Sequence, residues 1–124
     1  MNYTLAQEFY FDAAHRLDRD VDVESSRRVH GHSYHVEVAV TGKPDPATGM
    51  IVDLAVLRAA IDDVRGVLDH RLLNDIEELG APTIENLARY LFEYLSRKIT
   101  GVSQITVTRR ASGDRCTLAS APSD

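Results

Sequence analysis

The segment that decides the fold of this chain is His30-Gly31-His32-Ser33-Tyr34-His35-Val36-Glu37-Val38-Ala39-Val40-Thr41. Its even positions hold two histidines, then a tyrosine and a row of valines, whereas its odd positions are mostly small or polar. A period of two predicts a β-strand, so His30 and His32 project from the same face as the apolar row. Side chains two residues apart lie about 6.6 Å from each other along a strand, close enough to converge on one ion.

An earlier stretch alternates in the same way and brings a third histidine to this segment. One of its faces, with the exception of Gln7, carries Tyr3, Leu5, Phe9, Phe11 and Ala13. The pattern predicts a half-buried strand whose apolar face ends at His15. Residues 16–29 are polar, highly charged and without a sustained period, so we expect a surface loop between the two strands.

Two amphipathic helices are predicted after these strands. Residues 42–49 contain two glycines and two prolines, which indicates a turn, and Met50-Ile51-Val52 is expected to extend or bend the sheet. Asp53 is predicted to cap a helix whose apolar residues recur every three or four positions up to Leu68. Thr83 is predicted to cap a second helix, which ends at Thr100-Gly101.

The remaining sequence predicts a final pair of strands. Gln104–Arg110 alternates again, Ser112–Arg115 indicates a turn, and Cys116–Ala119 forms a short last strand. We therefore expect one α+β domain over residues 1–124, an antiparallel four-stranded sheet with two helices in β-β-α-α-β-β order. Short strands leave exposed edges, and edge-to-edge assembly into an oligomeric barrel is one way to cover them.

The composition excludes several classes of function. The chain has 124 residues and a formal net charge of −5, which argues against bulk binding to nucleic acid or to an anionic membrane. We expect no signal peptide and no membrane span, because no apolar run approaches the roughly 20 residues that a span requires. A single cysteine, Cys116, rules out an internal disulfide and is typical of a reducing cytoplasm.

The three histidines His15, His30 and His32 form a candidate metal site. Three neutral imidazoles leave the fourth tetrahedral position of Zn²⁺ free, which is the arrangement of catalytic zinc sites. Structural zinc sites use four protein ligands, usually including thiolates. The alternative is that the His-Gly-His spacing is accidental, because short motifs arise by chance. The residues favour an open zinc site but name no substrate.

The sequence resembles the family of 6-pyruvoyltetrahydropterin synthase and 6-carboxytetrahydropterin synthase over nearly the whole chain. Five motifs carry the resemblance in order: Phe11-Asp12-Ala13-Ala14-His15-Arg16-Leu17, His30-Gly31-His32-Ser33-Tyr34, Thr48-Gly49-Met50-Ile51-Val52-Asp53, Leu68-Asp69-His70-Arg71-Leu72-Leu73-Asn74-Asp75 and Pro82-Thr83-Ile84-Glu85-Asn86-Leu87-Ala88. The first two are similar to the family's first-strand signature and to its His-Gly-His motif, and together they are specific.

The resemblance implies a tunnelling fold (T-fold), in which such units close into barrels as trimers that stack into hexamers. It implies Zn²⁺ held by His15, His30 and His32, and a pterin substrate, 7,8-dihydroneopterin triphosphate, bound between subunits. The implied product is a 6-substituted tetrahydropterin, either 6-pyruvoyl or 6-carboxy. The pathway (queuosine, biopterin or folate) stays open.

Asp69 and His70 are implied to relay protons in catalysis. A carboxylate fixes the tautomer of a neighbouring imidazole and stabilises its charged form, which leaves the other ring nitrogen to exchange protons. The residues alone allow another interpretation, a helix C-terminus with a polar neighbour. The Leu68–Asp75 motif favours the relay.

The chain departs from the family at Ser26. The family commonly has a cysteine four residues before the first histidine of His-Gly-His, and its thiolate is the base or nucleophile; some relatives have glutamate there. We place Ser26 at this catalytic position, where a serine hydroxyl needs a strong adjacent base. Glu24, two residues earlier, is a candidate for that base.

A second departure is Arg109. The resemblance implies that Thr83, Glu85 and position 109 contact the substrate, and family members usually carry at position 109 a glutamate that accepts hydrogen bonds from the pterin. An arginine presents only donors, so Arg109 is suited to a carboxylate or phosphate instead. The alternative is a solvated strand end, and Asp114 is a candidate for the missing acceptor.

Three hypotheses about function follow. The first is a zinc-dependent lyase that acts on 7,8-dihydroneopterin triphosphate or a close analogue. The second is a catalytically degenerate relative that binds zinc and a ligand without turnover, because the thiol and the pterin-anchoring glutamate are both missing. The third is a zinc hydrolase or lyase of a different, anionic substrate that Arg109 binds.

Overall fold

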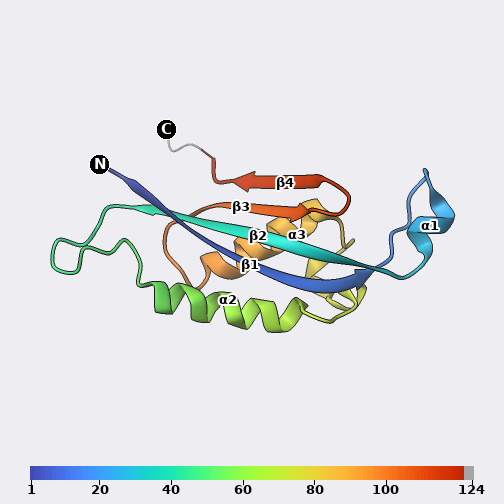
Figure 1. The fold of residues 1–124 in the computed structure, drawn as a ribbon, viewed down its shortest axis with the longest axis horizontal. Coiled ribbons are helices and arrows are strands. Elements are labelled where there is room, and N and C mark those ends of the chain that lie inside the picture. The colour runs from blue at the N-terminus through green and yellow to red at the C-terminus, as the bar shows by residue number, and fades with distance from the viewer. Residues whose placement is uncertain (122–124) are drawn as a thin grey trace.

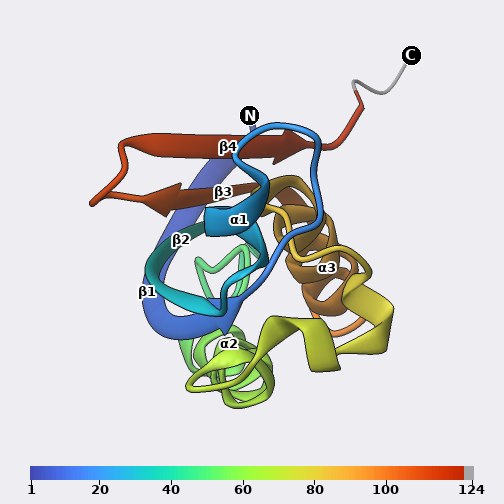
Figure 2. The same cartoon turned by 90° about the vertical axis from the view of Figure 1, so that its right-hand side faces the viewer.

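The computed structural model describes residues 1–121 of the chain. Its strands β1 (Tyr3–His15), β2 (His30–Gly42), β3 (Val102–Arg109) and β4 (Asp114–Ala119) form one antiparallel sheet in the order β1-β2-β3-β4. Helices α2 (Leu54–Leu68) and α3 (Ile84–Ser96) both pack against one face of this sheet (Figure 1 and Figure 2). The predicted fold class and the β-β-α-α-β-β order of the main elements are confirmed.

The pairing of β1 with β2 positions the histidines. The two strands pair along their full 13 residues, from Tyr3 opposite Gly42 to His15 opposite His30. Residues that face each other across an antiparallel pair project to the same side of the sheet. His15, His30 and His32 therefore gather on one face, at the same end of the strand pair, where the core ends.

The core lies between the apolar face of the sheet and the two helices. The sheet contributes the buried side chains of Phe11, Ala13, Tyr34, Val36, Val38, Val40, Val102, Ile105 and Val107. The helices contribute those of Leu57, Ala60, Ile61, Val64, Leu68, Leu87, Ala88, Tyr90, Leu91 and Leu95. Burial of this apolar surface stabilises the layered arrangement. Among residues 1–121, no helix combines the length and apolar character that crossing a membrane requires.

The predicted loop 16–29 contains a short helix, α1 (Val23–Arg27), which the sequence pattern did not predict. Its sequence, Val23-Glu24-Ser25-Ser26-Arg27, has no hydrophobic period, and hydrogen bonds between polar side chains hold it in place. The Ser25 hydroxyl and the Arg19 guanidinium both donate to the Asp22 carboxylate, and the Arg19 side chain also donates to Ser26. These bonds hold α1 just beyond the end of β1 and the start of β2 (Figure 1).

Two further expectations are wrong in detail. Residues 50–52 do not extend the sheet, because the chain leads directly from the turn to Asp53, whose carboxylate accepts the N–H of Ala55 at 2.8 Å and caps α2. The strand β4 begins at Asp114, inside the predicted turn, because Asp114 pairs with Arg109 across the hairpin. Two short 3₁₀ turns, η1 (Leu73–Asp75) and η2 (Glu77–Leu79), follow α2.

The entry into β3 depends on Gly101, and its replacement is predicted to destabilise the fold. Gly101 has a φ of +92°, and a Cβ atom there would lie 2.7 Å from the Thr41 carbonyl oxygen. Gly101→Ala should lower the free energy of unfolding by about 2 kcal/mol or more, because the left-handed backbone alone costs an alanine about 1–2 kcal/mol. Urea denaturation measures the change.

Gly66 provides the matched control. It lies within α2 and a Cβ atom there would meet nothing within 4 Å. Gly66→Ala should therefore raise the free energy of unfolding by about 0.5–1 kcal/mol through helix propensity. Equal effects of the two substitutions would contradict the role assigned to Gly101.

Candidate metal centre

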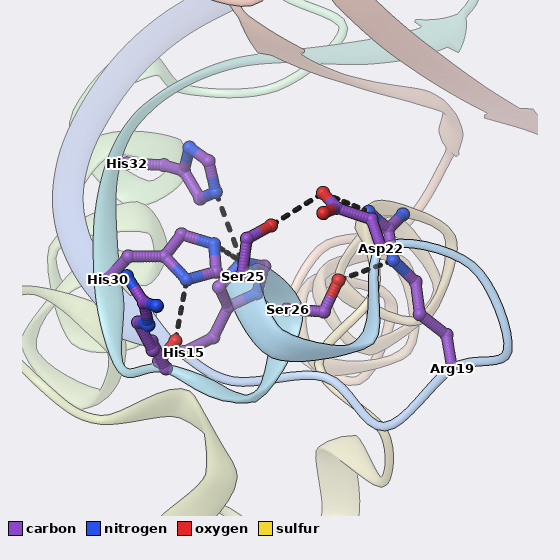
Figure 3. A network of polar contacts seen from close by, with 8 residues as sticks. His15, Arg19, Asp22, Ser25, Ser26, His30 and His32 are labelled. Atoms are coloured by element: carbon purple, nitrogen blue, oxygen red, sulfur yellow. Dashed lines mark hydrogen bonds and ion pairs between the residues drawn. The ribbon is translucent and has the colours of Figure 1, made fainter.

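Three imidazoles converge where β1 ends and β2 begins. The Nε2 atom of His15 lies 3.0 Å from Nε2 of His30 and 3.0 Å from Nε2 of His32. The three rings are mutually inclined by 72° to 87°, so their nitrogens point to one centre while the rings avoid stacking. Figure 3 shows this convergence beneath α1. The predicted histidine cluster is therefore present in the fold.

The outer nitrogens of two of these rings fix their tautomers. Nδ1 of His15 lies 2.9 Å from the Pro82 carbonyl oxygen, and Nδ1 of His30 lies 2.8 Å from the Arg28 carbonyl oxygen. A carbonyl only accepts, so both Nδ1 atoms carry the proton and both Nε2 atoms present a lone pair. Such bonds to the outer nitrogen are typical of metal-ligating histidines.

The lone pairs that face each other in this cluster indicate that a cation fits here. Two Nε2 lone pairs 3.0 Å apart, on His15 and His30, repel each other unless a positive charge lies between them. Tetrahedral zinc with Zn–N bonds of 2.0–2.1 Å separates its ligand nitrogens by about 3.3 Å, close to the observed spacing. The donor set thus fits a divalent ion with an open fourth position.

Burial favours the neutral, metal-binding form of the His15 and His32 imidazoles. Desolvation lowers the pKa of His32 to about 4, helped by the charge of His15. Desolvation also lowers the pKa of His15, which is only 1% exposed, against the opposing effect of its bond to Pro82. Neither ring needs to lose a proton near neutral pH before it binds a metal ion.

Ser26 lines the same cavity as this cluster. It is buried on α1 and lines a cavity of about 480 Å³ together with all three histidines. Its hydroxyl accepts a hydrogen bond from Arg19, which in turn bonds Asp22, and Figure 3 shows this chain of contacts. Glu24 is exposed and does not line the cavity, so the structure does not place it as the base for Ser26.

Arg109, with Leu17 and Arg19, lines both this cavity and a second one. The second cavity, of about 410 Å³, is lined by Thr83 and Glu85 and shares Arg109 with the first. The Arg109 side chain is only 19% exposed and forms an ion pair with Asp114. It is therefore not a solvated strand end, and its charge is already partnered. The Thr83 hydroxyl accepts the N–H of Asn86 at 3.1 Å and caps α3, as predicted.

Asp69 and His70 form the expected pair, but on a separate surface. The Asp69 carboxylate lies 3.0 Å from Nδ1 of His70. His70 lines a shallow cavity of about 500 Å³, which contains His32 and not Ser26. The two implied catalytic groups, Ser26 and His70, are thus on different sides of the histidine cluster within one chain.

Cys116 does not replace the missing thiol. It lies on β4 opposite Val107, and burial raises the pKa of its thiol, with the charge of Glu85 acting in the same direction. A protonated, half-buried thiol is a poor base or nucleophile.

Sequence reasoning missed two arginines at the site. Arg19 bonds Ser26 across seven residues, and no periodicity predicts such a contact. Arg65 lies four residues before Asp69 on α2 and is ion-paired with it at 3.3 Å. That spacing is readable in a sequence, because residues four apart are neighbours on a helix.

Comparisons with known proteins agree with this geometry. A family model described as 6-pyruvoyl tetrahydropterin synthase matches residues 4–119. The chain belongs to this family. The similarity thus covers the histidine cluster, the Asp69–His70 pair and both cavities.

Individual relatives carry related names. The 6-carboxy-5,6,7,8-tetrahydropterin synthase of Synechocystis is 35% identical over 111 residues, 85% of this chain and 84% of the relative. The dihydroneopterin monophosphate aldolase of Pyrococcus furiosus is 36% identical over 91 residues, 73% of each chain. The structure of Caenorhabditis elegans 6-pyruvoyl tetrahydropterin synthase matches with a TM-score of 0.82 and 26% identity, covering 98% of this chain and 97% of that one.

The histidine cluster is predicted to bind zinc. His30→Ala should lower zinc affinity by more than roughly 100-fold, since it removes a ligand rather than one of its outer partners. His35→Ala is the matched control, because His35 lies on the opposite face of the same strand. It should keep about one zinc ion per chain in metal analysis after dialysis. Equal zinc content in the two variants would contradict the site.

Proposed function

We propose that this member of the pterin synthase family is a zinc-dependent lyase that converts 7,8-dihydroneopterin triphosphate, or a close analogue, to a 6-pyruvoyl or 6-carboxy tetrahydropterin. The observation that carries the proposal is the set of three converging imidazole nitrogens, with an open fourth position, in a chain of this family. His15, His30 and His32 would hold the Zn²⁺ ion, which supplies Lewis acidity to an oxygen of the substrate side chain.

His70 is the residue best placed to move protons. Its Nδ1 donates to Asp69, so Nε2 presents a lone pair that accepts a proton from a side-chain carbon of the substrate. Asp69 stabilises the imidazolium that results and keeps Nε2 as the exchanging nitrogen. His70 is 78% exposed, which leaves this nitrogen accessible to a ligand.

Ser26 is proposed to act as a hydrogen-bond donor to the substrate rather than as a base. Its oxygen already accepts from the cationic Arg19, and the nearby Asp22 carboxylate bonds Ser25 and Arg19 instead. A serine without a base is a weak nucleophile. Its hydroxyl proton remains free to bind a substrate oxygen in the cavity.

The second cavity is proposed to bind the pterin ring. Glu85 is exposed there beside Thr83 and offers a carboxylate for the N–H donors of the ring. Arg109 is held by Asp114 at the border of the two cavities. We propose that Arg109 donates hydrogen bonds to the carbonyl or ring-nitrogen acceptors of the ligand. Binding of a different anionic substrate would have to compete with Asp114, so we do not favour it.

We also propose a homo-oligomer, a hexamer built as a dimer of trimers, with the pterin bound between subunits. Within the described chain β4 has one unpaired edge, and so does the N-terminal half of β1, whereas residues 70–72 bond the other half of β1. Tyr3 and Tyr10 on β1 are more than half exposed. The separation of Ser26 from His70 within one chain is consistent with a site completed by a neighbour. The single cysteine still favours a reducing compartment, the cytoplasm.

Ser26 and Arg109 motivate an alternative, a zinc- and ligand-binding relative without turnover. Ser26 has an arginine and no carboxylate as its partner, and the position of the usual pterin-anchoring glutamate carries a paired arginine. Tight ligand binding without product would be the property of such a protein.

Product analysis of the zinc-loaded protein with 7,8-dihydroneopterin triphosphate tests the proposal. The unmodified protein should turn over, and His70→Ala should lower kcat by about 10²–10⁴-fold, the usual contribution of a general base. Ser26→Ala should have a smaller effect, about tenfold, as expected for the loss of a hydrogen bond to a substrate. His35→Ala is the control and should match the unmodified protein.

The product mass separates the outcomes. A 6-pyruvoyl or 6-carboxy product confirms the proposal, whereas a 6-hydroxymethyl product would indicate an aldol-type cleavage instead. If only Ser26→Cys forms product, the degenerate alternative holds. If neither protein does so, the pterin substrate itself is wrong.

A mixing experiment tests the shared site. His30→Ala and His70→Ala should each be inactive, whereas their co-expression with different tags should restore turnover in the purified hetero-oligomer. Restoration occurs only if one subunit supplies the histidine cluster and its neighbour supplies His70. Failure to recover turnover in a confirmed hetero-oligomer would show that each site is built within one chain.

A further inference from the structure

Arg65, in the last turn of α2, joins the helix to β1 and to the Asp69–His70 pair. Its Nε donates to the Tyr10 carbonyl oxygen at 2.8 Å, and its Nη2 lies 3.3 Å from Oδ2 of Asp69. Its guanidinium carbon lies 5.8 Å from the centroid of the Tyr10 ring. The planar guanidinium is thus held by β1 while it presents an N–H to the carboxylate.

The Asp69 carboxylate accepts hydrogen bonds from three donors. Its Oδ1 accepts the backbone N–H of Asp12 at 3.1 Å, and its Oδ2 is shared by Arg65 and by Nδ1 of His70. The bond from Asp12, with help from His70 and Arg65, outweighs desolvation and lowers the pKa of Asp69. The carboxylate is therefore ionised and fixed in place near neutral pH.

The orientation of the His70 ring depends on this carboxylate. His70 has a φ of +58°, in the left-handed region, and its N–H donates to the Asp12 carbonyl at 2.6 Å. Its ring is 78% exposed, so little packing restrains it beyond the bond to Asp69. Arg71 and His32 share its cavity, and neither bonds Oδ2 of Asp69.

We propose that Arg65 is the positioning residue of the Asp69–His70 pair. It holds Oδ2 of Asp69 against Nδ1 of His70 and, by sharing the negative charge, limits how strongly Asp69 stabilises the imidazolium. The inference rests on the function proposed above, in which Nε2 of His70 exchanges a proton with the substrate.

Arg58 provides a matched control on the same helix. It lies seven residues before Arg65, on the same face of α2, and its Nε donates to Oε1 of Gln7 on β1 at 3.1 Å. Both arginines therefore tie α2 to β1, but only Arg65 also contacts the relay carboxylate. Arg65→Gln should lower the thermal midpoint at least as much as Arg58→Gln, because Arg65 also contacts Asp69 and the Tyr10 ring.

Kinetics distinguish positioning from a merely structural role. Arg65→Gln should lower kcat on the order of tenfold and leave KM within about twofold, since the residue acts on the reacting geometry and not on ligand binding. Arg65→Lys should recover part of kcat, and Arg58→Gln should change nothing.

A spectroscopic readout keeps this test independent of turnover. In protein labelled with ¹⁵N-histidine, His70 should show the Nδ1–H tautomer, and Arg65→Gln should mix the two tautomers whereas Arg58→Gln should not. If Arg65→Gln and Arg58→Gln match in both the tautomer and kcat, the proposal is wrong. If the unmodified protein forms no product, the proposed function fails, and the tautomer comparison alone then decides whether Arg65 positions the pair.

Discussion

The arrangement of the site depends most on three imidazole nitrogens that converge on one point. Two of them, Nε2 of His15 and Nε2 of His30, face each other with no proton between them. The carbonyl groups of Pro82 and Arg28 accept hydrogen bonds from the Nδ1 atoms of His15 and His30. The Nε2 atoms of the two rings therefore carry lone pairs, and they lie 3.0 Å apart. A cation between the two rings, such as the proposed zinc ion, would relieve that repulsion. The full-length pairing of β1 with β2 creates the arrangement, because a shift of one residue would turn His30 and His32 to the other face.

The remaining groups are arranged around this cluster in three cavities. Ser26 lies in the cavity of the histidines, Thr83 and Glu85 line the next one, and His70 lies on the third. Arg109 borders two of these cavities and His32 borders two. In the proposed function, ligand binding, metal coordination and proton transfer would use different cavities that share lining residues. Such a layout suits a substrate whose ring and reacting side chain are handled by different residues.

The sequence predicts the sheet, the two long helices and the histidine cluster, because periodicity in strands and helices reflects which side chains are buried. It did not predict α1, which polar contacts of Arg19 and Asp22 stabilise without any apolar period. It did not pair Arg109 with Asp114, although their positions on either side of a tight turn make them direct neighbours in a hairpin. It also does not show that Ser26 and His70 lie in different cavities, since that separation depends on how the segment after α2 packs against β1.

We propose that three imidazoles of this chain hold one zinc ion and leave a fourth position open. X-ray absorption at the zinc edge of the zinc-loaded protein tests it most directly. We expect three imidazole nitrogens at about 2.0–2.1 Å and one further oxygen ligand. A first shell that contains sulfur, or fewer than three imidazoles, would contradict it.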